Sequence, residues 1–399
     1  MGWQICDLMK ARMMFIEDCE RGSLSMTEVC RRHGISRKTG YKWLARYQQK
    51  GFEGLADESR RPRQSPFKSS ELIEQSVLAV RAEHPCWGGR KIRRVLINEG
   101  MAPGEAPAAS TVTNILRRHG KLGAGTREGA PDFKRFERRE PNDLWQMDFK
   151  GHFAMDMGRR CHPLTVLDDH SRYNLVLEAC RGESIRDVKP VLESAFRRYG
   201  LPRQILCDHG NPWGKGLNEF GEIAGTPALV VWLTRLGVHV IHGRVRHPQT
   251  QGKEERFHRT LAAEVIRSEE LWRNHRHCQE AFDSWRVIYN HKRPHESLGM
   301  ETPSERYRLS ERSYPELLPP PESFYLEDDE LRRVKSKGEI TFRNRFFHVG
   351  NAYRGEVIAL RRTGEQRWDI YHCWKRLGTA DFSLPAKAKG RYHTIRKGR

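Results

Sequence analysis

Three acidic residues lie in segments whose patterns place them at one edge of a sheet. Asp148 stands inside an alternating segment, 145–150 (Trp-Gln-Met-Asp-Phe-Lys), so it projects from the face opposite the apolar side chains. Asp208 follows the short apolar run 204–207, at the carboxyl end of an expected strand, where α/β sheets bind ligands. Glu255 lies on a basic segment that we expect to be helical. The pattern therefore favours a shared acidic site.

Each acid alone has an ordinary structural interpretation. Asp148 suits an exposed polar position on a half-buried strand, Asp208 suits a turn, and Glu255 suits an ion pair on a basic helix. Together they form a set of hard oxygen ligands without Cys or His, which selects Mg²⁺, with Mn²⁺ as a substitute. Two such ions, about 3.5–4 Å apart, can activate an attacking oxygen and stabilise the leaving oxygen of a phosphodiester.

The composition indicates a polyanionic partner. Lys plus Arg is 71 and Asp plus Glu is 51, which gives a net charge of +20 and a pI near 9.8. No apolar run approaches the roughly 18 residues of a bilayer span, and acids at 17, 18 and 20 interrupt any signal peptide. The nine cysteines include no Cys-x-x-Cys pair, as expected in a reducing cytosol. We expect DNA as partner, no membrane, and a cytoplasmic location.

Residues 1–55 read as a helix-turn-helix domain. Ser25 and Glu28 form a capping box, Gly34 ends that helix, and Ser36 can cap a second one. Gly40 lowers the helix propensity of that second helix. Its exposed cations, Arg37, Lys38 and Lys42, would contact DNA. The alternative is a plain helical hairpin with a solvated basic face.

Residues 69–121 read as a second domain of the same kind, after a basic linker. Helices are expected over 71–83 and 90–98, and Ser110 is expected to cap a third helix that stops at Gly120. Three residues of the third helix would face outward: Thr111, Asn114 and Arg117. Either unit alone could be scaffolding, but two in tandem suggest a long, bipartite DNA site.

Residues 141–310 follow an α/β order compatible with a ribonuclease-H-like fold. The expected elements are strands 144–150, 163–167 and 174–179, helix 185–199, strand 204–207, a helical stretch through 236, strand 238–242 and a helix from about 252. Beyond a proline-rich break, residues 322–385 alternate like a small antiparallel β-barrel with strands 339–349, 356–362 and 367–374. Residues 386–399 form a basic tail. The barrel is expected to contact either DNA or another subunit.

Four motifs carry a family resemblance. The segments 145–148 (Trp-Gln-Met-Asp), 208–211 (Asp-His-Gly-Asn), 247–256 (His-Pro-Gln-Thr-Gln-Gly-Lys-Glu-Glu-Arg) and 289–295 (Tyr-Asn-His-Lys-Arg-Pro-His) resemble the DDE transposases of bacterial insertion sequences, whose core is similar to retroviral integrase. The resemblance is strongest over 143–307. It implies that Asp148, Asp208 and Glu255 are the catalytic metal ligands, Glu255 rather than Glu254 because it stands three residues after Gly252.

The resemblance also implies the reaction and its partners. Water cuts the 3′ end of the element, and the freed 3′-OH attacks target DNA, without a covalent protein intermediate. The partners would be double-stranded DNA of the terminal repeats and the target, bound by a homo-multimer in the bacterial nucleoid. Three cations near Glu255 would contact terminal phosphates, namely Lys253, Arg256 and Arg259. The alternative is ordinary ion pairing on the helix.

Two departures distinguish the chain from many integrases. The interval between Asp208 and Glu255 is 47 residues, longer by about an extra helix, which we expect within 216–237. His209 stands where Asn or Ser is frequent in the family. A second acidic pair, Asp168-Asp169, is expected to form a structural turn with Arg172.

Two other functions remain open. A DNA-binding regulator with an inactive catalytic fold would need no acids, and a metal nuclease or resolvase on the same fold would cleave DNA without joining it. Zinc is not expected, because the spacing of His275, His277, Cys278, His291 and His295 matches no compact finger.

Overall fold

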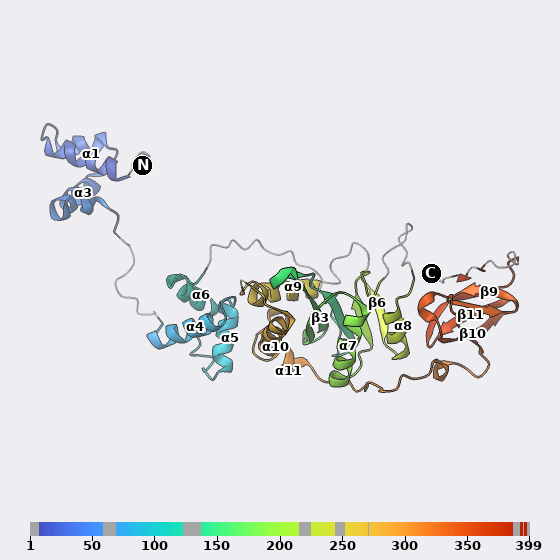
Figure 1. Ribbon diagram of the computed structural model, residues 1–399. Coiled ribbons are helices and arrows are strands. Elements are labelled where there is room, and N and C mark those ends of the chain that lie inside the picture. Colours follow the sequence, from blue (N-terminus) through green and yellow to red (C-terminus); the bar gives the residue numbers. More distant parts are fainter. Residues whose placement is uncertain are drawn as a thin grey trace. The chain divides into compact units, whose positions relative to one another are not determined.

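The computed structural model describes residues 8–58, 69–122, 137–214, 225–243, 252–269, 271–385, 392–393 and 395–396 (Figure 1). Contacts divide the chain into two units, residues 1–68 and 69–399. None of the helices in these described ranges has the length and apolar character needed to cross a membrane.

The first unit is a three-helix domain with the expected caps. It consists of α1 (Leu8–Glu20), α2 (Met26–Arg32) and α3 (Arg37–Lys50), followed by a 3₁₀ turn, Gly51–Leu55. The capping box of Ser25 and Glu28 is present, and Ser36 accepts a hydrogen bond from the Thr39 amide. Gly40 does not distort α3. A Cβ there would stand 2.5 Å from Cys30 Sγ, so glycine permits the close approach of α3 to α2.

The second helical domain opens the second unit. Its helices are α4 (Glu71–Glu83), α5 (Gly89–Asn98) and α6 (Ala109–Arg118), which share a buried core around Val77, Ile92 and Ile115. The expectation that Ser110 caps the third helix was wrong. The N-cap is Ala108, without a side-chain hydrogen bond, and Ser110 lies inside the first turn.

A mixed sheet forms the centre of the second unit. Its order is β4-β3-β1-β5-β6, with the short β2 (Phe153–Ala154) also paired to β3. β3 is antiparallel to β4 and β1, whereas β1, β5 and β6 are parallel. The bounds are β1 (Leu144–Phe149), β3 (Arg160–Asp168), β4 (Asn174–Cys180), β5 (Gln204–Cys207) and β6 (His239–His242). This order confirms the expected ribonuclease-H-like core.

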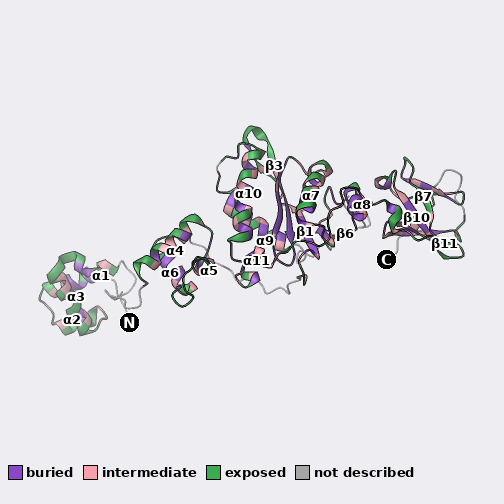
Figure 2. Cartoon of the chain, turned by 90° about the horizontal axis from the view of Figure 1, so that it is seen from below, coloured by how far each residue is buried: buried purple, intermediate pink, exposed green. Residues whose placement is uncertain are grey.

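Helices cover both faces of this sheet (Figures 1 and 2). On one face, α7 (Ile185–Tyr199) and α8 (Ala228–Arg235) pack on Trp145 and Met147. On the other face, α9 (Gly252–Leu261), a π-helical turn (Ala262–Ile266) and α10 (His275–His291) pack on Leu167 and Leu177. The strands are therefore buried between two helical layers, and side chains on alternate residues of β1 reach opposite layers.

The helix expected within 216–237 corresponds to α8, although residues 215–224 lie outside the described ranges. Leu229 and Trp232 join the core beneath α7, whereas Val231 joins the core of the C-terminal domain. The Trp374 indole also donates a hydrogen bond to the Thr234 carbonyl at 3.0 Å. α8 thus packs against both the sheet and the C-terminal domain.

The C-terminal domain is not the closed barrel that the strand pattern suggested. After α11 (Pro303–Arg306), the described strands form a five-stranded antiparallel sheet, in the order β13-β12-β11-β10-β7, and a separate hairpin, β8-β9. The bounds are β7 (Glu330–Arg333), β8 (Glu339–Phe342), β9 (Arg345–His348), β10 (Val357–Gly364), β11 (Arg367–His372), β12 (Lys375–Asp381) and β13 (Ile395–Arg396). β13 and β7 lie at opposite ends of this strand order and do not pair with each other, so the described strands do not close into a barrel.

The expected single strand 339–349 is this β8-β9 hairpin. Its turn residues, Arg343 and Asn344, have φ angles of 47° and 58°, which is the left-handed geometry of a two-residue hairpin turn. The pattern was misjudged because Arg at such a position carries no turn signal. The hairpin buries Ile340 and Phe342 against the apolar face of the five-stranded sheet.

Candidate active site

Asp148 lies on the face of β1 that meets α9. It pairs in register with Thr165 of β3, and its neighbours Trp145 and Met147 point into the opposite layer. Its side chain keeps 25% of its exposure, and His258 Nδ1 lies 4.0 Å from Oδ2. Burial, followed by the negative charge of Asp208, raises the pKa of Asp148 to about 7. The protein therefore holds this carboxyl where ionisation is costly.

Asp208 stands at the carboxyl end of β5, next to the strand that carries Asp148. Its Oδ1 accepts hydrogen bonds from the Gly210 amide, at 2.8 Å, and from the Trp213 indole. Trp213 is buried and stacks on Phe149 of β1, with ring centroids 5.3 Å apart. Oδ2 has no hydrogen bond from any described residue. One oxygen of Asp208 is thus fixed in position, and the other is left open.

The first turn of α9 carries two adjacent glutamates in opposite environments. Glu255 is exposed, and its charge helps to raise the pKa of Asp148. Glu254 is buried, with 1% of its side chain exposed, and accepts a hydrogen bond from Thr165. Burial, followed by the charge of Asp148, raises the pKa of Glu254 well above its usual value.

The predicted carboxylates lack cationic neighbours. In the described ranges, neither Asp148, Asp208 nor Glu255 forms an ion pair with a lysine or arginine. No three His, Cys, Asp or Glu side chains among the described residues lie close enough to hold one ion together. The charges nevertheless act on one another, since both Asp208 and Glu255 raise the pKa of Asp148. An all-oxygen set that is short of positive charge fits a divalent cation.

The cations predicted near Glu255 fall into two groups. Arg256 and Arg259 are exposed on α9. Lys253 instead forms an ion pair with the buried Asp169, at 2.5 Å, and keeps only 17% of its side-chain exposure. Burial, followed by the charge of Arg172, lowers the pKa of Lys253 to about 8. For Lys253 the ion-pairing alternative describes the structure, because its ammonium group points into the protein.

The predicted DNA-contacting residues of the helical domains are mostly on the surface. Arg37, Lys38 and Lys42 are all exposed on α3. On α6, Asn114 and Arg117 are exposed and hydrogen-bonded to each other at 2.5 Å, whereas Thr111 is half-buried.

The second acidic pair lies in a turn with Arg172, as expected, and further donors bind both carboxylates. Asp168 accepts hydrogen bonds from the Asn142 and Ser171 amides. Asp169 accepts from Gln146 and Lys253. The Arg172 amide closes the turn by donating to the Asp168 carbonyl at 2.9 Å, while its guanidinium group binds Glu137.

Sequence reasoning missed a buried polar cluster beneath Asp148. Thr165 Oγ1 lies 3.0 Å from Glu254 Oε2, 2.9 Å from His258 Nε2 and 3.0 Å from the Asp148 carbonyl oxygen. Glu254, His258 and Leu261 follow the i, i+4, i+7 spacing of a core-facing helix stripe. Polar residues at two positions of such a stripe were the available signal.

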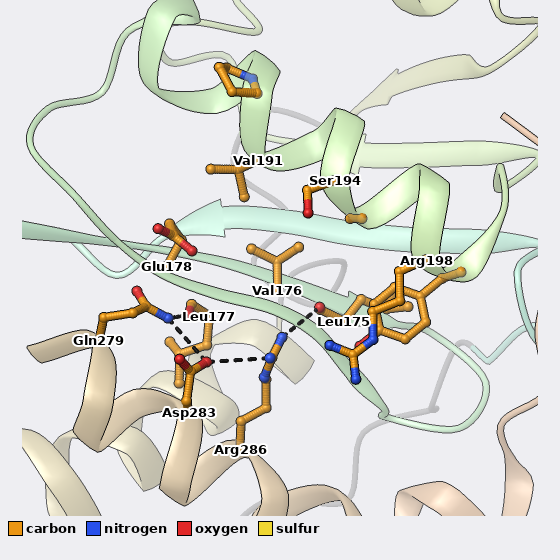
Figure 3. Close-up of a pocket in the computed structure, with 13 residues that line it drawn as sticks. Leu175, Val176, Leu177, Glu178, Val191, Ser194, Arg198, Gln279, Asp283 and Arg286 are labelled. Carbon is orange, nitrogen blue, oxygen red and sulfur yellow. Dashed lines mark hydrogen bonds and ion pairs between the residues drawn. The ribbon is translucent and has the colours of Figure 1, made fainter. Parts of the chain in front are cut away.

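A pocket of about 340 Å³ lies between β4, α7 and α10 and is not lined by Asp148, Asp208 or Glu255 (Figure 3). Side chains of α10 close the outer edge of β4 there: Arg286 donates to the Leu175 carbonyl and Gln279 to the Leu177 carbonyl. None of the predicted catalytic residues lines this pocket. The chemistry proposed for the acids therefore does not involve it.

Family models match most of the described domains. Integrase core domain models match residues 138–248 and 236–303. A helix-turn-helix domain matches 12–63, a homeodomain-like domain matches 39–116, and the C-terminal domain of IS481 family transposases matches 329–387.

Two insertion-element proteins are similar to the chain. The IS476 uncharacterized 39.2 kDa protein of Xanthomonas euvesicatoria is 24% identical over 280 residues, which are 69% of this chain and 76% of that protein. The IS407 uncharacterized 31.7 kDa protein of Burkholderia multivorans is 29% identical over 165 residues, 41% of this chain. The chain spans 55% of the length of that second relative.

Solved integrases resemble the chain more distantly. A simian T-cell lymphotropic virus intasome, in complex with a PP2A regulatory subunit, is 15% identical over 78% of this chain and all of that chain, with a TM-score of 0.36. The HTLV-2 integrase catalytic core in complex with magnesium is 14% identical over 43% of this chain and 99% of that chain, with a TM-score of 0.32. These scores are low, so the assignment depends on the sequence matches. Those matches confirm the resemblance of this chain to DDE-type insertion-sequence transposases with an integrase core and DNA-binding helix-turn-helix domains.

Proposed function

We propose that this chain is a transposase that binds the ends of a mobile element, cleaves their 3′ strands and joins them to target DNA. The observation that carries the proposal is the meeting of Asp148 and Asp208 at one sheet edge, beside a helix that carries Glu255. Acids without cationic partners are costly in an apo protein, and their retention is best explained by a ligand that neutralises them.

We assign Asp148, Asp208 and Glu255 as ligands of Mg²⁺, with Mn²⁺ as a substitute. When bound, such ions supply an activated oxygen nucleophile and stabilise the leaving 3′ oxygen. Trp213 and the Gly210 amide hold one oxygen of Asp208, which leaves its other oxygen without a hydrogen bond from a described residue. Asp148 has to lose any proton it carries before it can bind a cation. Because its pKa is raised, a bound cation would favour the ionised form.

The basic surfaces hold the DNA against this acidic centre. Arg256 and Arg259 lie on the same helix as Glu255 and are exposed, which suits contacts to terminal phosphates. The exposed cations of α3 and the polar face of α6 suit recognition of two parts of a terminal repeat. Processing and joining of two ends requires at least two active sites, so we propose a homo-multimer on DNA.

The test is product analysis with the full chain, labelled DNA from the ends of the element that encodes it, and an unlabelled target plasmid in Mg²⁺. Labelled ends that become joined to the plasmid are the expected result. Cleavage without joining would support a nuclease or resolvase instead. Specific binding without cleavage, in both Mg²⁺ and Mn²⁺, would support a regulator with an inactive catalytic fold.

A further inference from the structure

Glu254 is a buried acid to which the proposed chemistry assigns no role. It shares the core-facing stripe of α9 with Phe257 and Leu261, both fully buried apolar residues. A carboxyl at such a position costs free energy that an apolar side chain would not. Its Oε1 makes no hydrogen bond to any described residue, so the cost is only partly offset.

The one hydrogen bond that the Glu254 side chain makes among the described residues leads to Asp148. Thr165 is fully buried and lies opposite Asp148 in the β1–β3 ladder. Its hydroxyl contacts Glu254 Oε2, His258 Nε2 and the Asp148 carbonyl oxygen, all within 3.0 Å. A hydroxyl donates only one hydrogen, so when it donates to the Asp148 carbonyl, both Glu254 and His258 have to donate to it for all three contacts to be hydrogen bonds.

His258 completes the cluster from the same helix. Its Nε2 lies 3.6 Å from Glu254 Oε2, and its Nδ1 faces Asp148 Oδ2 at 4.0 Å. Thr165 therefore holds one end of the imidazole by a hydrogen bond, with Glu254 beside it, and the other end of the ring faces the Asp148 carboxyl. Burial lowers the pKa of His258.

We propose that Glu254, Thr165 and His258 form a buried support that positions Asp148 for metal binding, and that Glu254 is a positioning residue and not itself a ligand. The inference rests on the proposed function, since it assigns the cluster a role toward the ions of that site. Supports of this kind orient a ligand before the cation arrives, and their loss weakens metal binding without removing a ligand.

The experiment compares five single variants of the full chain, Glu254→Leu, Glu254→Gln, Glu255→Gln, Thr165→Val and Leu261→Ala, and the double variant Glu254→Leu/Thr165→Val. Two quantities are measured: the Mg²⁺ concentration for half-maximal cleavage, and the rise in unfolding temperature that Mg²⁺ causes without DNA. Glu254→Leu and Thr165→Val are expected to raise the half-maximal Mg²⁺ concentration about 10- to 100-fold. The double variant should be no worse than Glu254→Leu, because both changes break one cluster.

Two controls separate positioning from other roles. Glu254→Gln preserves the shape and should stay within about threefold of the wild-type Mg²⁺ requirement, because the amide can still hydrogen-bond to the Thr165 hydroxyl. Leu261→Ala removes packing on the same face of α9 and should lower stability with no change in the Mg²⁺ requirement. A loss in Glu254→Gln as large as that in Glu255→Gln would make Glu254 a ligand and overturn the proposal. An unchanged Mg²⁺ requirement in Glu254→Leu would also overturn it.

The two proposals fail separately. If the wild-type chain neither cleaves nor joins DNA, the proposed function is wrong. The Mg²⁺-induced rise in unfolding temperature still decides the role of the cluster in that case, since an equal rise in wild type and Glu254→Leu would refute positioning.

Discussion

Two acidic pairs lie on neighbouring parts of the same sheet, and the protein treats them in opposite ways. Asp168 and Asp169 are fully buried at the end of β3, and N–H donors from Asn142, Ser171 and Lys253 surround them. Asp148 and Asp208 are partly open and, among the described residues, have no lysine or arginine partner. This difference fits the proposed roles, in which the first pair, with several donors, stabilises the fold and the second, with fewer donors, binds a ligand.

The largest effect should come from changing an oxygen ligand to sulfur. Asp208→Cys is expected to slow joining in Mg²⁺ by about a thousandfold, because the loss of metal-assisted stabilisation amounts to several kcal/mol. Mn²⁺, which accepts sulfur more readily, should restore part of the rate. The measurement is the joining rate in each metal, and wild-type speed of Asp208→Cys in Mg²⁺ would contradict the assignment.

Substitution within the structural pair, Asp168 and Asp169, should lower the free energy of unfolding. Asp169→Ala leaves the buried ammonium group of Lys253 without its partner and should cost about 3–5 kcal/mol of unfolding free energy. Chemical denaturation measures the change, with Asp328→Ala, at an exposed acidic position, as the matched control. Equal stability of the two variants would show that the buried pair is not what holds this end of β3.

The pH dependence of stability should separate the pairs further. The pKa of Asp148 is raised from 3.8 to about 7 in the folded state, so the native chain binds an extra proton between these values. Ionisation of Asp148 therefore lowers the stability of the apo protein as pH rises from 4 to 7. Asp148→Asn, which has no proton to lose, should not show this decrease. At pH 8 the variant should be more stable by up to about 4 kcal/mol, and at pH 4 it should match the wild type.

Denaturation at both pH values, without divalent metal, tests this expectation. A variant that is less stable than the wild type at pH 8 would mean that Asp148, like Asp168, serves the fold.

The smallest effect concerns the surface cations beside the acidic site. Arg259→Ala should lower the salt dependence of DNA binding by about one phosphate contact, whereas Lys253→Ala should lower stability instead. Fluorescence anisotropy over a range of salt concentrations distinguishes the two variants. An unchanged salt slope in Arg259→Ala would remove it from the proposed DNA surface.

The elements with strong local signals were predictable from sequence. Helices 71–83 and 185–199 and strand 204–207 have the expected bounds, because caps and apolar periods agree at those places. The hairpin turn at Arg343 and the open edges of the C-terminal sheet were not, because tertiary packing decides them.

The candidate site was predictable in part. The motifs predict Asp148, Asp208 and Glu255 as the ligands, which stays a prediction. They could not show that Glu254 is buried or that Lys253 turns inward to Asp169. Both depend on the rotation of α9 against β1 and β3, which is decided by tertiary packing of the whole buried face of the helix. The Thr165 contacts join strand and helix residues that are far apart in sequence, and no local pattern reports them.

The central claim is that Asp148 acts with Asp208 and Glu255 on DNA and not on the fold. Its most direct test is the joining of labelled element ends by Asp148→Asn beside the wild type, in Mg²⁺ and at equal occupancy of DNA. We predict joined product from the wild type and none from the variant, while binding and folding are retained. Joined product from Asp148→Asn at a comparable rate would contradict the claim.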